Sequence, residues 1–278
     1  MKLSMVMTTQ QTRFQAATFS GDLRTNLASL QAMGYDGVEL AIREPALIDL
    51  EALSALVDEF GLAVPAIGTG QAWGEEGLSF TDPDPAIRMS AIARIKSHLP
   101  LAAHFKAVVI IGLIRGVLKP GVSQAQAMEW LREALQDCSR AAEDQGVRLA
   151  LEPINRYETS LINNVAQGMQ LIEEVGSPNF GLLLDSFHMN IEDAVIEGSI
   201  RTCAERIFHF HVADSNRLYP GGGHLDFASI LGALHQIGYQ GWVSGEFLPI
   251  PDAVTAAQNN IRYLKPIITK IQTPDKGI

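Results

Sequence analysis

Short apolar runs alternate with longer amphipathic segments along the chain. Eight of these runs predict buried strands, and they cover residues 3–7, 37–42, 63–68, 107–112, 147–152, 180–185, 207–212 and 242–247. Their starting points lie between 26 residues (37 to 63) and 44 residues (63 to 107) apart. That spacing is typical of a repeating unit made of a strand, a helix and their loops.

The segments between these runs have the periodicity of helices. In residues 123–146, apolar side chains recur at steps of three and four and form one stripe, made of Met128, Leu131, Leu135, Cys138 and Ala142. Five of the predicted helices are followed by a glycine in the position that ends a helix, namely Gly34, Gly61, Gly146, Gly176 and Gly238. Each glycine then leads into a predicted strand.

Eight strand–helix units in 278 residues predict an α/β fold, a single (β/α)8 TIM barrel that spans residues 1–278. We expect residues 270–278 to form a frayed tail. The alternative is a doubly wound open sheet, which usually has a glycine-rich phosphate loop after its first strand. Here the first strand is followed by TTQQTR (8–13), which contains no glycine.

Charge and composition exclude several classes of protein. Lys plus Arg number 21 and Asp plus Glu number 31, so the net charge of −10 argues against a nucleic-acid partner. No apolar stretch has the length of a membrane span, and the N-terminal run is too short for a signal peptide. The two cysteines, Cys138 and Cys203, have no zinc-site spacing. We therefore expect a cytoplasmic protein with no membrane partner.

The ends of the last four predicted strands carry the chemistry. These strands end in LALEP, LLLDSFH, HFHVAD and VSGEF, whereas the first four strand ends offer few ionisable groups. In a TIM barrel the active site lies at the carboxyl ends of the strands. The two-residue alternation of a strand predicts that four side chains face the barrel mouth together: Glu152, Asp185, His211 and Glu246.

The alternation also divides the run IFHFHV (207–212) into two faces. His209 shares the inward face with His211 and is expected one layer deeper, as a buried structural histidine or as a support for a metal ligand. Phe208, Phe210 and Val212 are expected on the opposite face.

Three carboxylates and one imidazole at a dry rim require a positive partner, because burying unpaired charge is costly. Either each acid pairs with an arginine or caps a helix, or the group holds a divalent cation. Four such residues in register on consecutive strands favour the cation. Oxygen and imidazole donors suit Mn²⁺ best, with Co²⁺, Mg²⁺ or Zn²⁺ as alternatives.

Four motifs resemble those of the ketose 3-epimerase family of xylose isomerase-like TIM barrels, the family of the D-tagatose and D-psicose 3-epimerases: LEPINRYE (151–158), LDSFHMNIED (184–193), FHVADSNR (210–217) and GEF (245–247). Two earlier segments are similar to a branch that epimerises 5-keto-L-gluconate, AIGTGQAW (66–73) and VVIIGLIRG (108–116). The resemblance covers most of the chain.

The resemblance implies a role for each matching residue. Glu152, Asp185, His211 and Glu246 are implied to bind the metal, with Glu152 and Glu246 also serving as the acid–base pair. Glu158 and His188 are implied to lie near the first carbons of the substrate, and Arg217 to hold its oxygens. The resemblance further implies a homo-oligomer, either a dimer or a tetramer.

Epimerisation beside a ketone removes a proton from one face of an enediolate and returns one to the other face, so it needs two bases. Glu152 and Glu246 lie three strands apart, roughly 135° around an eight-stranded mouth, and meet this need. An aldose–ketose isomerase is the alternative, since it uses the same metal and one base. Arg217 and Arg115 are candidates to bind a substrate carboxylate. The alternatives are that Arg115 pairs with a nearby acid and that Arg217 is a loop residue in solvent.

Two other functions fit the sequence less well. An abasic-site endonuclease resembles this barrel but carries several histidines on its early strands, and none stands at the first four strand ends here. A sugar-binding barrel without catalysis does not need two acids that face each other across a metal. We therefore expect a metal-dependent epimerase of the isomerase class, acting on a small sugar or sugar acid.

Overall fold

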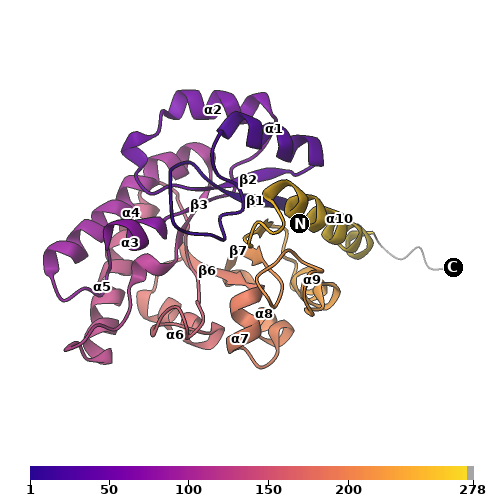
Figure 1. Cartoon of the computed structure of the whole chain (residues 1–278). Coiled ribbons are helices and arrows are strands. Elements are labelled where there is room, and N and C mark those ends of the chain that lie inside the picture. The colour runs from indigo at the N-terminus through magenta and orange to yellow at the C-terminus, as the bar shows by residue number, and fades with distance from the viewer. Residues whose placement is uncertain (274–278) are drawn as a thin grey trace.

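The structure is a computed structural model that describes residues 1–273. Eight parallel strands close into a barrel and follow one another around it in sequence order. Figure 1 shows the whole chain. The strands are β1 (Lys2–Thr8), β2 (Gly37–Ala41), β3 (Ala66–Gly68), β4 (Val108–Ile111), β5 (Leu149–Leu151), β6 (Phe180–Asp185), β7 (Ile207–Val212) and β8 (Trp242–Gly245). The pairing of β1 with β8 completes the ring. The predicted (β/α)8 barrel and all eight predicted strands are therefore confirmed.

Helices surround this barrel and fill the connections between strands (Figure 1). They are α1 (Leu23–Met33), α2 (Leu50–Glu59), α3 (Gln71–Glu76), α4 (Pro85–Phe105), α5 (Gln124–Glu143), α6 (Val165–Val175), α7 (Ser186–Glu192), α8 (Ile196–Cys203), α9 (Phe227–Gln236) and α10 (Ala253–Gln272). Three single 3-10 turns are η1 (Pro45–Leu47), η2 (Leu113–Arg115) and η3 (Ala204–Arg206). Two of these elements, α3 and η2, follow β3 and β4 directly and so lie at the mouth.

Local sequence signals define where the helices begin and end. Asp22, Asp49 and Asp252 stand before α1, α2 and α10, and each side chain accepts a hydrogen bond from a backbone N–H of the first turn. The five glycines predicted to follow helices all have positive φ, from 61° to 86°: Gly34, Gly61, Gly146, Gly176 and Gly238. This left-handed conformation ends a helix at little steric cost only when the residue has no Cβ.

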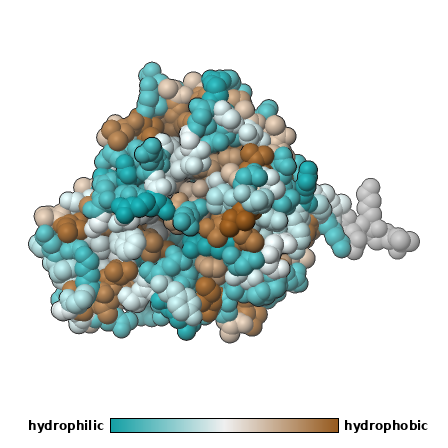
Figure 2. All heavy atoms as spheres, viewed as in Figure 1, coloured by the Kyte–Doolittle hydropathy of each residue, from teal (hydrophilic) through white to brown (hydrophobic). Residues whose placement is uncertain are grey.

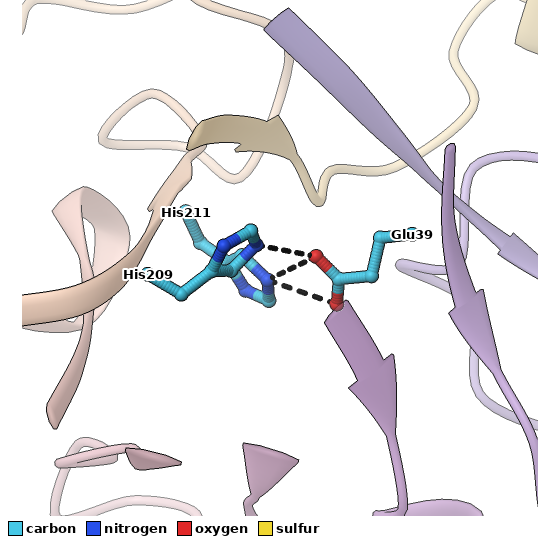
Figure 3. Close-up of side chains that lie close together, drawn as sticks. All are labelled: Glu39, His209 and His211. Atoms are coloured by element: carbon cyan, nitrogen blue, oxygen red, sulfur yellow. Dashed lines mark hydrogen bonds and ion pairs between the residues drawn. The ribbon is translucent and has the colours of Figure 1, made fainter. Parts of the chain in front are cut away.

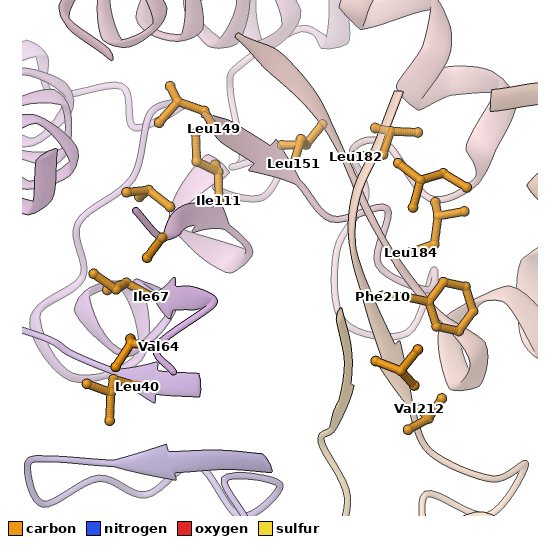
Figure 4. Close-up of a cluster of buried hydrophobic side chains, with 14 of the residues drawn as sticks. Leu40, Val64, Ile67, Ile111, Leu149, Leu151, Leu182, Leu184, Phe210 and Val212 are labelled. Carbon is orange, nitrogen blue, oxygen red and sulfur yellow. The ribbon is translucent and has the colours of Figure 1, made fainter. Parts of the chain in front are cut away.

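Two apolar layers lie on either side of the strands. Inside the barrel, a small cluster is formed by Ala66, Val108, Ile110, Ala150 and Leu183. Outside it, the larger core packs between strands and helices, and Figure 4 shows ten of its residues by name: Leu40, Val64, Ile67, Ile111, Leu149, Leu151, Leu182, Leu184, Phe210 and Val212. The small interior side chains leave room at the mouth for polar groups, and the outer layer supplies most of the hydrophobic stabilisation.

The prediction that Phe208 shares the outer face with Phe210 and Val212 is wrong. The register between β6 and β7 shifts at Leu182 and Leu183, because Leu182 pairs with Ile207 while Leu183 pairs with His209. Because of this irregularity, Phe208 does not follow the alternation of inward and outward side chains along β7. It packs against the apolar cluster inside the barrel. The inward positions of His209 and His211 are unaffected, because they follow the shift.

The surface and the C-terminal segment complete the description. The face drawn in Figure 2 mixes hydrophilic residues with small, separate groups of hydrophobic ones. Within the described residues, no helix combines the length and the apolar character needed to cross a membrane. Helix α10 extends to Gln272, into the segment expected to fray, and residues 274–278 of that segment lie outside the described residues.

Candidate active site

A cavity of about 300 Å³ opens at the carboxyl ends of the strands. Its lining includes six of the eight residues singled out from the sequence: Glu152, Glu158, His188, His211, Arg217 and Glu246. Asp185 lies directly beside it, within the cluster described next. The eighth residue, Arg115, is absent from the lining.

The structure brings the four predicted metal ligands together at this cavity. One donor atom from each of Glu152, Asp185, His211 and Glu246 lies within 4.8 Å of the donor atoms of the others. The first three are buried, and the Glu246 side chain is only 13% exposed. His211 Nδ1 is 3.9 Å from Asp185 Oδ2 and 3.7 Å from Glu246 Oε2. Gly112 makes room for this cluster, since a Cβ there would lie 3.3 Å from Glu152 Oε2.

The protein balances the charges in this cluster only in part. Burial, together with the charge of Glu246, raises the pKa of Glu152 well above its ordinary value. Burial is also the main cause that raises the pKa of Asp185 to about 6, and Glu246 adds to it. Glu152 Oε1 and His211 Nδ1 are buried without a hydrogen-bond partner. Divalent cations bind carboxylate oxygens and imidazole nitrogens, and here such atoms converge on one point without partners. This arrangement fits a metal site.

A second charged cluster holds the other side of the His211 ring, and in Figure 3 Glu39 faces both His209 and His211. Glu39, from the middle of β2, reaches across the barrel interior and is 1% exposed. His209 Nε2 donates to Glu39 Oε2 at 2.8 Å, and His211 Nε2 donates to Oε2 at 2.9 Å and to Oε1 at 3.1 Å. Burial opposes ionisation of this carboxyl group, but His211 and His209 overcome it and lower the pKa of Glu39.

Glu39 was missed by the sequence analysis, which considered only strand ends. The signal was present, because an acid within the otherwise apolar run GVELAI (37–42) requires a buried partner. His209 is buried and bonded to Glu39, in agreement with the expectation that it lies beneath the rim as a structural or supporting histidine.

A chain of hydrogen bonds connects the remaining predicted residues. Asn155 donates through Nδ2 to Glu158 Oε1 at 2.9 Å and to His188 Nδ1 at 2.8 Å. Arg217 Nη1 donates to the same Glu158 oxygen at 2.9 Å. Because His188 Nδ1 accepts, its proton is on Nε2, and this atom lies 3.6 Å from Glu152 Oε1. Burial and the Arg217 charge lower the pKa of His188 well below its ordinary value, so this imidazole is neutral.

Arg217 is held in place by its surroundings. Its backbone adopts a left-handed conformation with φ of 61°, which is uncommon for a residue with a side chain. Its guanidinium carbon lies 4.9 Å from the centre of the Phe187 ring and 5.9 Å from that of Phe14. The loop therefore orients the arginine toward the acidic cluster.

Arg115 occupies a different position from the one expected of a substrate-binding arginine. It ends η2, is fully buried, and within residues 1–273 donates a single long hydrogen bond, from Nη1 to Ile162 O at 3.4 Å. Burial lowers the pKa of Arg115 to about 10, an effect that Glu152 and Glu158 partly offset. The guanidinium group thus lies behind the cavity wall, where it places positive charge near Glu152.

The opposite side of the cavity has a different character. Small and apolar residues from β1 to β4 and the turn that follows form part of its lining: Val6, Ala41, Gly68, Ile110 and Leu113. Charged residues line this side too: Glu39 from β2, Arg13 from the segment after β1, and Glu75 from α3. Trp73 and Phe14 contribute aromatic surface to the same cavity.

Known proteins match this chain over most of its length. The family model for the xylose isomerase-like TIM barrel matches residues 27–267. An L-ribulose 3-epimerase of Mesorhizobium japonicum is 32% identical, over 81% of this chain and 75% of that protein. A 3-dehydro-D-guloside 4-epimerase of Escherichia coli is 26% identical, over 90% of this chain and 96% of that protein.

A solved structure agrees with these matches. The crystal structure of a D-allulose 3-epimerase from Methylomonas sp., in complex with D-allulose, superposes with a TM-score of 0.81 and 26% identity, and the match covers 96% of each chain. The chain therefore belongs to the xylose isomerase-like TIM barrel family and is an enzyme of the isomerase class, an epimerase.

Proposed function

We propose that this enzyme is a metal-dependent sugar epimerase that inverts the carbon next to the ketone of a ketose or a keto-sugar acid. The observation that carries the proposal is the cluster of four donors, which contains two glutamates from strands three positions apart and two buried donor atoms without partners. The relatives named as 3-epimerases support the same reaction type.

Glu152, Asp185, His211 and Glu246 would hold the metal, for which Mn²⁺ suits the donors best. A divalent cation at this place supplies several kcal/mol of stabilisation to the negative charge that develops on the substrate oxygens. Because the four side chains come from β5 to β8 and the turns after them, the barrel fixes their spacing before substrate binds.

Glu152 and Glu246 act as the acid–base pair in this proposal. One carboxylate removes the proton from the carbon next to the ketone, and the other returns a proton to the opposite face of the enediolate. The raised pKa of Glu152 suits this task, because burial and the charge of Glu246 favour its protonated form.

The hydrogen-bonded chain around Glu158 orients the substrate. The neutral His188 presents its Nε2–H beside Glu152, where it is placed to donate to a substrate oxygen. Arg217 and Glu158, which line the cavity as an ion pair, are placed to bind hydroxyl groups on either side. Arg115 takes no part in these proposed contacts, because it lies outside the cavity lining.

The charge distribution favours a neutral sugar over a sugar acid. In the part of the chain that the structure describes, the two arginines that line the cavity, Arg13 and Arg217, are both paired with acids, Glu75 and Glu158. A substrate carboxylate would have to compete with these existing pairs.

NMR spectroscopy of a panel of ketoses, keto-sugar acids and 3-keto-glycosides in D₂O tests the proposal. Deuterium at the carbon next to the ketone, with formation of the epimer, is the expected result. Deuterium at C1 or C2 with an aldose product would instead identify an aldose–ketose isomerase. If no member of the panel exchanges in the presence of Mn²⁺, the proposal fails.

A further inference from the structure

His211 can serve as a metal ligand only if the ring nitrogen that faces the cluster carries no proton. That nitrogen is Nδ1, which lies between Asp185 and Glu246 and has no hydrogen-bond partner. A neutral imidazole carries one proton, and hydrogen bonds to the rest of the ring determine which nitrogen holds it. The group that binds Nε2 therefore controls whether Nδ1 is available.

The group bound to Nε2 is the carboxylate of Glu39. Both of its oxygens lie within 3.1 Å of His211 Nε2, and a carboxylate can only accept from that nitrogen (Figure 3). Glu39 is fixed in turn by His209, whose Nε2 donates to Oε2 at 2.8 Å. All three side chains are at most 2% exposed, so water does not compete for these bonds.

We propose that Glu39, oriented by His209, is a positioning residue that keeps the proton of His211 on Nε2 and so leaves Nδ1 free to bind the metal. This inference rests on the metal site of the proposed function. Glu39 and His211 also border the cavity, but the contacts of Glu39 argued here are with the two histidines.

The geometry argues against a direct role for Glu39 as a metal ligand at the same site. Its two oxygens are occupied by three contacts with histidine nitrogens, and all of these have hydrogen-bond length. Breaking them would leave two buried imidazole N–H groups without acceptors, which is costly. A carboxylate that instead accepts from a ligating histidine orients the ring and makes it a stronger donor.

Titration of the metal-free protein with Mn²⁺ tests this proposal without any measurement of activity. Glu39→Gln removes the charge but keeps one acceptor, and it should weaken Mn²⁺ binding by about 10- to 100-fold. Glu39→Leu removes both acceptors and should weaken it at least as much. Glu75→Gln is the matched control, because Glu75 also lines the cavity but bonds to Arg13 and Thr12 rather than to a histidine.

NMR spectroscopy of the unmodified chain loaded with diamagnetic Zn²⁺ gives a second test, which is independent of how the variants fold. With ¹⁵N-labelled histidine, His211 should show a protonated Nε2 and an unprotonated, metal-bound Nδ1. The proposal is overturned if the proton is on Nδ1, if both Glu39 variants bind Mn²⁺ as tightly as the unmodified protein, or if a second Mn²⁺ binds between Glu39 and the histidines.

These outcomes separate the inference from the proposed function. An enzyme that binds one Mn²⁺ through His211 Nδ1 but exchanges no sugar would refute the epimerase proposal and leave the role of Glu39 intact. An active epimerase whose Mn²⁺ affinity is unaffected by Glu39→Leu would support the epimerase proposal and refute the role of Glu39.

Discussion

The two halves of the barrel mouth share one architecture but differ in chemistry. On the side of β5 to β8, the charged half, an ionisable residue stands at or next to the end of every strand, and Glu152, Asp185, His211 and Glu246 meet in one cluster. On the side of β1 to β4, the apolar half, most strand residues that line the cavity are small or apolar, such as Val6, Ala41, Gly68 and Ile110, and Glu39 is the charged one.

This difference shows how a regular barrel can hold chemically distinct groups on the two sides of one cavity. The apolar half leaves space for the substrate, whereas the charged half concentrates donors that would be balanced by the cation of the proposed function. Glu39 is the exception, since it starts from the apolar half and extends beneath the rim to the histidines of β7. The first half of the barrel therefore contributes to the site both as cavity wall and, through Glu39, as a support for the histidines.

The strongest test of this comparison removes one glutamate from each half. Glu246→Gln should lower turnover by about 10⁴-fold. This is the upper end of the range for loss of a general acid or base, and we expect it because Glu246 is also a proposed metal ligand. Glu75→Gln, which neutralises a carboxylate on the other side of the same cavity, should retain most activity. Rates from the deuterium-exchange assay and unfolding midpoints for both variants check this. Full activity of Glu246→Gln would refute the two-base scheme.

Metal removal should have the next largest effect. Chelation is expected to lower turnover by about 10³-fold, because several kcal/mol of charge stabilisation is lost, and Mn²⁺ or Co²⁺ should restore it best. Mn²⁺ at 100 times its dissociation constant should also stabilise the fold by about 2.7 kcal/mol. Activity that is indifferent to a chelator, together with an unfolding midpoint that Mn²⁺ does not change, would contradict a metal centre in the charged half.

Replacement of Arg217 should have a moderate effect. Arg217→Met keeps much of the side-chain volume over Phe187 but removes hydrogen bonds from a charged donor, worth about 1.5 to 3 kcal/mol. We expect kcat/KM to fall by about 10- to 100-fold while Mn²⁺ affinity changes little, because Arg217 bonds to Glu158 and not to the four donors. Equal losses in metal affinity and turnover would place the arginine in the metal centre instead.

A change in the apolar half should have the smallest effect. Leu113→Ala removes part of the cavity wall, and a loss of about 1 kcal/mol in substrate contact corresponds to about a fivefold rise in KM. The position at which deuterium enters the sugar should be unchanged. A different exchange position in this variant would show that the apolar wall, and not the charged cluster, selects the reacting carbon.

Much of this picture follows from the sequence because local rules govern it. The eight strands and the glycines that end five helices could be predicted from hydrophobic periodicity and backbone sterics alone. The convergence of four donors followed from the alternation of strand side chains and from the rule that parallel strands end at one rim.

The rest depends on contacts between distant segments, which periodicity does not report. Glu39 contacts residues 170 and 172 positions away, and only the closed barrel brings them together. Arg115 was expected at the cavity, but it lies in a turn that directs it into the protein. Phe208 was expected on the outer face of β7, but a single register shift between β6 and β7 changes its position.

Anomalous diffraction from a crystal soaked in Mn²⁺ tests the central claim most directly. We predict one strong peak per chain, within bonding distance of Glu152, Asp185, His211 and Glu246, with His211 contributing Nδ1. Absence of a peak among these four residues, or a peak coordinated by Glu39 and His209 instead, would contradict the account.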